Sequence, residues 1–142
     1  MKKVLVLLCA IAFLGCGSDD SNGSSINEQQ IVGRWYHTYK TVNGGPAIEH
    51  QNNCETARDH WDILADHSIL FNFYGFTCEM GNSFTGNWSL SGNNFAISST
   101  FDPVAIDETL RVISLTANDL ELERTVETSS GENIERLHFE RD

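Results

Sequence analysis

Eight short stretches with strand-like sequence follow one another between residues 31 and 141, and turn-forming residues separate them. Apolar and polar residues alternate within most of them: Phe84, Trp88 and Leu90 lie on one face of their stretch, with polar residues between them. This period of two is typical of a strand with one buried face, and no stretch shows the 3.6-residue period of a helix over helical length. The stretches comprise residues 31–42, 60–65, 69–76, 84–90, 94–101, 108–115, 120–127 and 134–141. We therefore expect an all-β protein.

The links between these stretches indicate how the strands pair. Most links are short and contain Gly, Asn, Asp or Pro, so consecutive strands should be antiparallel. Eight antiparallel strands with one apolar face close most simply into an up-and-down barrel, which leaves no unpaired sheet edge. An open β-sandwich is the alternative. Outside the strands, we expect a short helical turn at residues 55–59 and a polar loop at residues 78–83.

The N-terminus has the sequence of a removable targeting signal. Two lysines precede an uncharged apolar run over residues 4–14, which is too short to cross a membrane as a helix but suits a signal peptide. The run ends in Gly15-Cys16, which resembles the site at which bacterial lipoproteins are cleaved and acylated. The resemblance implies a signal peptide over residues 1–15, cleavage between Gly15 and Cys16, and fatty acyl chains such as palmitate on Cys16. An ordinary signal peptide with an incidental cysteine is the alternative.

Residues 16–30 would then link the lipid to a folded domain over residues 31–142. Ile26 is the one apolar residue that follows Cys16 in this link, so we expect a flexible polar tether. Gly17 follows the cysteine, and resemblance to other bacterial lipoproteins implies transfer to the outer membrane of a Gram-negative cell. The sequence Ser18-Asp19-Asp20 is similar to acidic tags that direct some lipoproteins to the cell surface. A plain soluble linker is the alternative, with the domain facing the periplasm.

The chain has four cysteines, of which two would remain for the folded domain. Cys9 leaves with the signal peptide and Cys16 carries the lipid. Cys54 and Cys78 remain in an oxidising compartment, so we expect a disulfide between them. A zinc site that includes His50 or His60 is the alternative, although the spacing matches no common zinc motif.

Charge and motifs exclude several classes of function. The net charge of −11 opposes binding to nucleic acid or to anionic lipid headgroups, so we expect membrane contact through the anchor alone. The sequence contains no nucleophile elbow, no P-loop and no dinucleotide-binding motif, so we expect no enzyme, no catalytic residue and no cofactor. Acidic and imidazole side chains gather between residues 59 and 67, but we expect them on a solvated outer face and predict no metal site. That group comprises Asp59, His60, Asp62, Asp66 and His67.

Several motifs resemble those of lipocalin-like domains in Gram-negative lipoproteins. They are a Gly-x-Trp in the first strand ending at Trp35, a pair of cysteines around the next hairpin, a second Gly-x-Trp ending at Trp88, and an aromatic-x-Arg ending at Arg141. The resemblance implies that Trp35 packs at the closed end of the barrel beneath Arg141. In this sequence His37 shares the face of Trp35 and is expected to be a hydrogen-bonded interior residue.

The same resemblance implies a small apolar or amphipathic ligand at the open end of the barrel. The candidate binding residues are Trp35, His37, Tyr39, Phe71, Phe73 and Trp88. In the alternative interpretation the aromatic side chains fill the barrel, and its loops contact another protein of the cell envelope. The two interpretations differ in the volume of the interior cavity, because a ligand site needs several hundred Å³.

Overall fold

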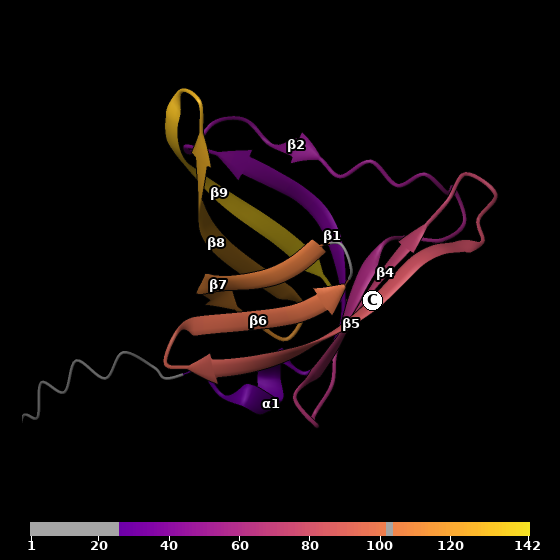
Figure 1. Cartoon of the computed structure of the whole chain (residues 1–142), viewed down its shortest axis with the longest axis horizontal. Coiled ribbons are helices and arrows are strands. Elements are labelled where there is room, and N and C mark those ends of the chain that lie inside the picture. Colours follow the sequence, from indigo (N-terminus) through magenta and orange to yellow (C-terminus); the bar gives the residue numbers. More distant parts are fainter. Residues whose placement is uncertain (1–25, 102–103) are drawn as a thin grey trace, which may run out of the picture.

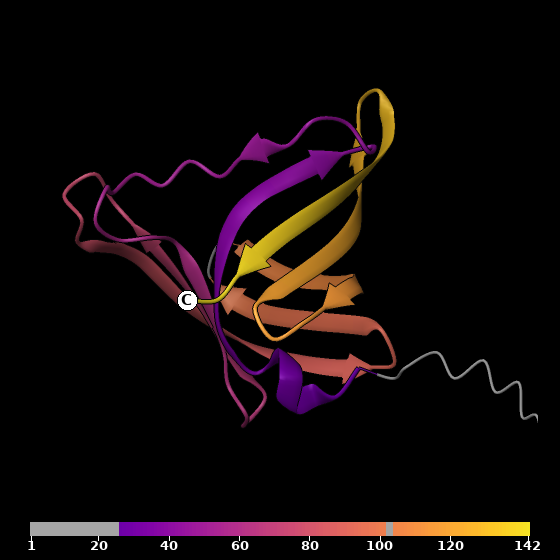
Figure 2. The same ribbon diagram turned by 180° about the vertical axis from the view of Figure 1, so that it is seen from behind.

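The computed structural model describes residues 26–101 and 104–142, which form a closed antiparallel barrel (Figure 1). Each barrel strand pairs with the next in sequence, and the last, β9, pairs with the first, β1 (Figure 2). This closing ladder excludes an open sandwich and confirms the predicted eight-stranded barrel. The barrel strands are β1 (Gly33–Val42), β3 (His60–Ile63), β4 (Ser68–Tyr74), β5 (Met80–Ser91), β6 (Asn94–Phe101), β7 (Val104–Leu115), β8 (Asp119–Thr128) and β9 (Gly131–Glu140).

Two short elements lie outside the ring of eight strands. β2 (Ile48–Glu49) pairs with the C-terminal half of β1, and α1 (Glu28–Ile31) precedes β1. Among the described residues, no helix has the length and apolar character needed to cross a membrane. The predicted signal peptide, the cleavage site at Gly15 and the acylation site at Cys16 lie outside the described residues.

Three segments differ from the sequence-based expectations. Residues 80–83 are not a loop but the start of β5, where exposure on both faces removes the apolar alternation that marks a strand. Residues 55–59 contain no helical turn. The end of the predicted tether is folded, because Asn27 caps α1 through a hydrogen bond to Gln29 N and Ile26 packs against the core.

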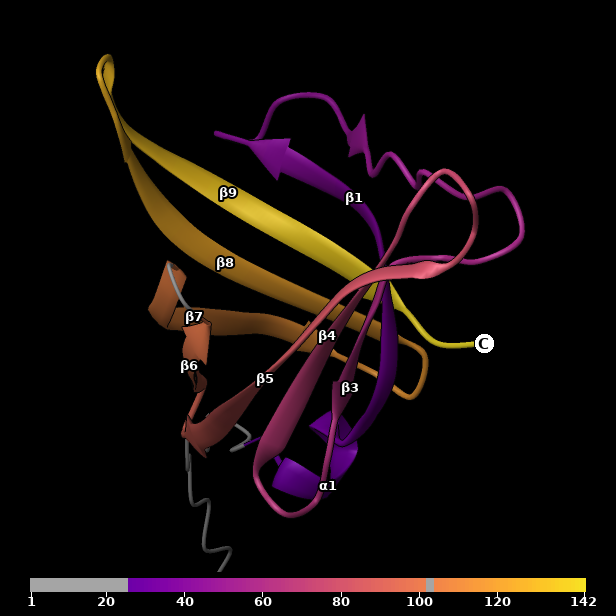
Figure 3. The same ribbon diagram turned by 45° about the vertical axis from the view of Figure 1, so that its right-hand side comes forward.

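The half of the barrel next to α1 is filled with apolar side chains. α1 lies across this end (Figures 1 and 3), and its Ile31 is fully buried against the core. Each buried aliphatic or aromatic side chain contributes about 1.5–3 kcal/mol relative to exposure. The largest of these are Trp35, Phe95, Phe139, Ile63, Ile69, Leu110, Leu120 and Leu122. We call this filled half of the barrel, next to α1, the closed end.

Trp35 and Arg141 meet at the closed end. The Arg141 guanidinium carbon lies 3.9 Å from the centre of the Trp35 ring, and Trp35 Nε1 donates to Ile31 O at 2.7 Å. Gly33 lies against the same guanidinium and has a φ of 141°, a conformation that residues with a side chain rarely adopt. A Cβ at this position would lie 3.3 Å from Arg141 Cζ. Glycine therefore lets the last residues of the chain cover the first strand.

A segment over residues 43–59, which we call the strap, completes the wall at the other end. β3 pairs with only the first four residues of β1, and farther along β1 the strap takes its place through β2. The strap runs to the tip of the β4–β5 hairpin (Figure 3), where Cys54 and Cys78 form a disulfide. The predicted disulfide is thereby confirmed, and it excludes the alternative of a zinc site that uses these two cysteines.

Candidate functional site

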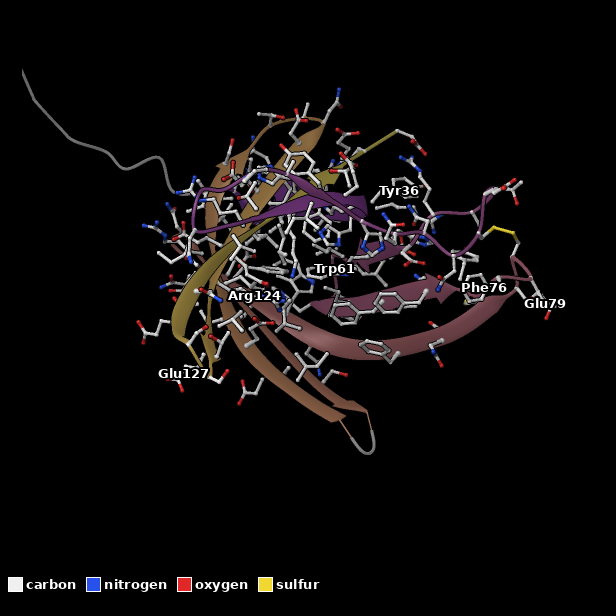
Figure 4. All side chains as sticks on the ribbon, turned by 90° about the horizontal axis from the view of Figure 1, so that it is seen from above. Tyr36, Trp61, Phe76, Glu79, Arg124 and Glu127 are labelled. Carbon is white, nitrogen blue, oxygen red and sulfur yellow. A yellow bond between two sulfur atoms is a disulfide. The ribbon has the colours of Figure 1, made fainter. Side chains whose placement is uncertain are left out.

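A cavity of about 320 Å³ opens at the end of the barrel opposite α1, between β1 and the strap. Its apolar wall comes from Ile48, Trp61, Phe73 and Leu137. Its polar wall comes from His37, Lys40, Glu49, His50, Gln51 and Arg124. Figure 4 looks into this end and shows Trp61 and Arg124 within the barrel. The interior is thus filled at the closed end and hollow at the open end.

Two of the six predicted ligand residues, His37 and Phe73, line the cavity. Trp35 and Trp88 lie in the closed half instead: Trp88 is buried, donates from Nε1 to Leu64 O at 2.9 Å and packs against Phe95. Phe71 is buried between Trp61 and Phe84. Sequence alternation identifies inward-facing residues, but it does not tell the filled half from the hollow half.

The sixth candidate, Tyr39, lies on the outside of the barrel. The register against β9 shifts between His37 and Tyr39, so Thr38 is an extra residue, a β-bulge. Its hydroxyl donates to His138 O at 3.0 Å. After the bulge the two faces exchange: Tyr39 stacks on the outward His138 ring at 4.0 Å, and Lys40 points inward to Glu135 at 2.7 Å. The prediction for Tyr39 was wrong because it assumed an uninterrupted strand.

His37 is held between two rings in the wall of the cavity. Its ring centre lies 5.0 Å from that of Phe139 and 4.5 Å from that of His50. Burial, with the nearby charge of His50 as a second cause, lowers the pKa of His37 to about 4. Its buried Nε2 finds no hydrogen-bond partner among the described residues, whereas a hydrogen bond with the backbone of Tyr39 agrees with the expected hydrogen-bonded histidine. At neutral pH the cavity wall therefore carries an uncharged imidazole.

An ion network that sequence reasoning missed lies on the inner wall. Glu135 Oε1 accepts from Lys40 Nζ at 2.7 Å, and Glu135 Oε2 accepts from Arg124 at 2.8 and 2.9 Å. Arg124 also donates to Glu108 at 3.2 Å. Burial raises the pKa of Glu135, but the hydrogen bonds from Lys40 and Arg124 outweigh it and hold the carboxylate ionised. The available signal was that Arg124 and Glu135 occupy inward positions of strands that pair directly.

Several acidic and imidazole residues of β3 and its neighbours pair with other side chains. Asp62 pairs with Arg34, and Asp59 shares a hydrogen bond with His50 at 2.9 Å. No group of three or more metal-ligating side chains comes together in the described part of the chain. The expected solvated face was wrong for Asp59 and His60, which are buried. Asp59 Oδ1 accepts from Tyr74 N, so this carboxylate joins the strap to β4.

Comparisons with known proteins agree with this architecture. A family model described as a lipocalin-like domain matches residues 31–122. A solved lipocalin-like protein from Bacteroides uniformis ATCC 8492 superposes with a TM-score of 0.60 at 16% identity, covering 80% of this chain and 99% of that one. The bovine lipocalin allergen Bos d 2 gives a TM-score of 0.48 at 16% identity, covering 82% and 76% of the two chains. A bovine odorant-binding protein, in complex with a selenium-containing odorant, gives 0.45 at 11% identity, covering 82% and 73%. A search of curated protein sequences returned no match.

Proposed function

The chain belongs to the family of lipocalin-like domains, and from that premise we propose that it binds a small amphipathic molecule at the open end of its barrel. The observation that carries the proposal is the cavity of about 320 Å³, which lies within the range of small-molecule sites. Its wall is divided between apolar side chains and a few polar groups, as expected of a site that fixes the orientation of its ligand.

The apolar part of the wall gives the site its affinity. Trp61 and Phe73 are partly buried aromatic residues, and Leu137, which also lines the cavity, is 5% exposed. A ligand that covers these side chains removes apolar surface from water, at about 25 cal/mol for each Å². The disulfide and Asp59 hold the strap over the same side chains, so the site forms before the ligand arrives.

Binding of a neutral fluorescent probe, N-phenyl-1-naphthylamine, tests the proposal. The probe should gain fluorescence on mixing with the purified protein and lose it when a competing amphiphile is added. Phe73→Ala should weaken probe binding about 5- to 30-fold, the range expected for one buried aromatic contact of about 1–2 kcal/mol. Ile48→Ser, at a lining residue that is 52% exposed, should weaken it without loss of folding.

Phe76→Ala is the matched control. Phe76 is 86% exposed at the tip of the same hairpin and lies far from Trp61 (Figure 4). The control should bind the probe like the unmodified protein. A protein that takes up no probe, or equal losses in Phe73→Ala and Phe76→Ala, would contradict the proposed site.

We further propose that the domain is anchored to the outer membrane of a Gram-negative bacterium through acyl chains on Cys16. The signal-like N-terminus ending in Gly15-Cys16 supports this. Metabolic labelling with a fatty-acid analogue should mark the protein but not Cys16→Ser, and equal labelling of both would exclude the anchor.

A further inference from the structure

We propose that the ligand is an amphipathic carboxylic acid whose carboxylate is held by Lys40 and Arg124. This inference rests on the proposed function and specifies the ligand class for the same cavity. It follows from a surplus of hydrogen-bond donors in the wall of the cavity, beside the apolar side chains that share this wall.

The surplus is seen by comparing donors with acceptors in the ion network. Lys40 carries three N–H donors, and in the described part of the chain only Glu135 accepts from it. Arg124 carries five donors, of which Nε and one terminal nitrogen bind Glu135 and the other terminal nitrogen binds Glu108. Two N–H groups of Lys40 and at least one of Arg124 are left without an acceptor from the described residues.

The acceptors of the network are already engaged. Both carboxylate oxygens of Glu135 accept hydrogen bonds, as do both oxygens of Glu108. Lys40 and Arg124 line the cavity, whereas Glu108 and Glu135 are not among its lining residues. A ligand that enters here therefore meets cationic donors, with the carboxylates behind them. The acidic residue in the wall, Glu49, belongs to the strap and is exposed.

This wall suits a carboxylate better than any neutral or cationic head. A carboxylate offers acceptors only, and hydrogen bonds from a cation to a carboxylate are roughly twice as strong as neutral ones. A hydroxyl satisfies fewer donors, and an ammonium group places donors against donors. The two cations and two carboxylates of the network balance in charge. Recognition therefore depends on short-range hydrogen bonds and should change little with salt.

The geometry orients the rest of the ligand. When the carboxylate of the ligand binds Lys40 and Arg124, the apolar part of the ligand lies against Trp61, Phe73 and Leu137 in the same cavity. His37 is adjacent and uncharged at neutral pH, because burial lowers its pKa. His37 therefore adds no positive charge to those of Lys40 and Arg124 at neutral pH.

The test is displacement of the neutral probe by three ten-carbon amphiphiles that differ only in the head group: decanoate, decanol and decylamine. Decanoate should compete about tenfold more tightly than decanol, as one added charge-assisted hydrogen bond implies, and decylamine should be the weakest. In Lys40→Met, decanoate should lose most of its advantage over decanol, and its affinity should fall several-fold more than that of the neutral probe. Glu135 keeps its bonds from Arg124 in this variant.

Arg136→Met is the matched control. Arg136 lies on the outer face of β9 and donates to Glu121 and Glu123 of β8. The variant should therefore leave the order of the three amphiphiles unchanged. Probe binding without a preference for decanoate would overturn this inference but leave the proposed function standing. No probe binding at all would overturn the proposed function. An equal loss of affinity for the probe and for decanoate in Lys40→Met would show that Lys40 only shapes the cavity, and would also overturn the inference.

Discussion

Arg141→Ala should destabilise the barrel by about 2 kcal/mol, because it removes the cover from Trp35 at the closed end. Two contributions make up this value. The guanidinium above the indole ring contributes about 0.5–2 kcal/mol. Its terminal nitrogen donates to the backbone oxygens of Gln30 and Val32, and loss of these bonds costs about 0.5–1.5 kcal/mol each. Burial of Arg141, whose Nε finds no partner in the described residues, offsets part of the sum.

A double-mutant cycle with Trp35 tests the contact itself. Trp35→Ala should cost about 3–5 kcal/mol, as expected when a fully buried aromatic residue is deleted from a core. The double variant should be about 1 kcal/mol more stable than the sum of the two losses predicts, because residues in contact are not independent. Urea melts followed by far-ultraviolet circular dichroism give all four stabilities. Additivity within about 0.3 kcal/mol would show that the chain end does not cover the indole ring.

Two further predictions concern the open end. Because burial lowers the pKa of His37 to about 4, the unfolded chain binds a proton at this residue at a higher pH than the folded protein does. The free energy of unfolding should therefore be highest above about pH 6.5 and should fall between pH 6.5 and pH 4. After allowance for solvent at the cavity, the free energy of unfolding should fall by about 1–2 kcal/mol by pH 5. This fall should be absent from His37→Gln. Parallel profiles of stability against pH for the two proteins would contradict the burial of the His37 ring. Cys54→Ser opens a loop closed by residues 24 apart, which should lower the free energy of unfolding by about 3 kcal/mol and release the strap. Unchanged urea melts and unchanged probe affinity in Cys54→Ser would show that the strap holds itself in place.

Sequence reasoning succeeded where successive inward residues of a strand are buried. The alternation of Phe95 and Ile97 predicted residues 94–101, which are the observed bounds of β6. The same reasoning failed for residues 80–83, because that part of β5 extends past the core and is exposed on both faces. Strand pairing there depends on backbone hydrogen bonds to β4, which leave no pattern in the side chains.

The candidate site was harder to predict, for two physical reasons. A bulge adds one residue to a strand, and nothing in the sequence around Thr38 marks it, so Tyr39 was predicted as a ligand residue and Lys40 was not. Arg124 alternates with Leu122 and lies opposite Glu135, but neither charged residue was among the predicted ligand residues. Inward charges on paired strands are the signal that points to the polar wall of the cavity.

The central claim, that a small amphipathic molecule binds at the open end, is tested most directly by the indole N–H signals of the three tryptophans in a nitrogen-15 spectrum. Trp61 lines the cavity, whereas Trp35 and Trp88 are hydrogen-bonded to Ile31 and Leu64 in the closed half. Titration with N-phenyl-1-naphthylamine should shift the signal of Trp61 and leave the other two in place. Shifts of Trp35 or Trp88 with Trp61 unmoved, or no shift of any indole at saturating probe, would contradict the claim.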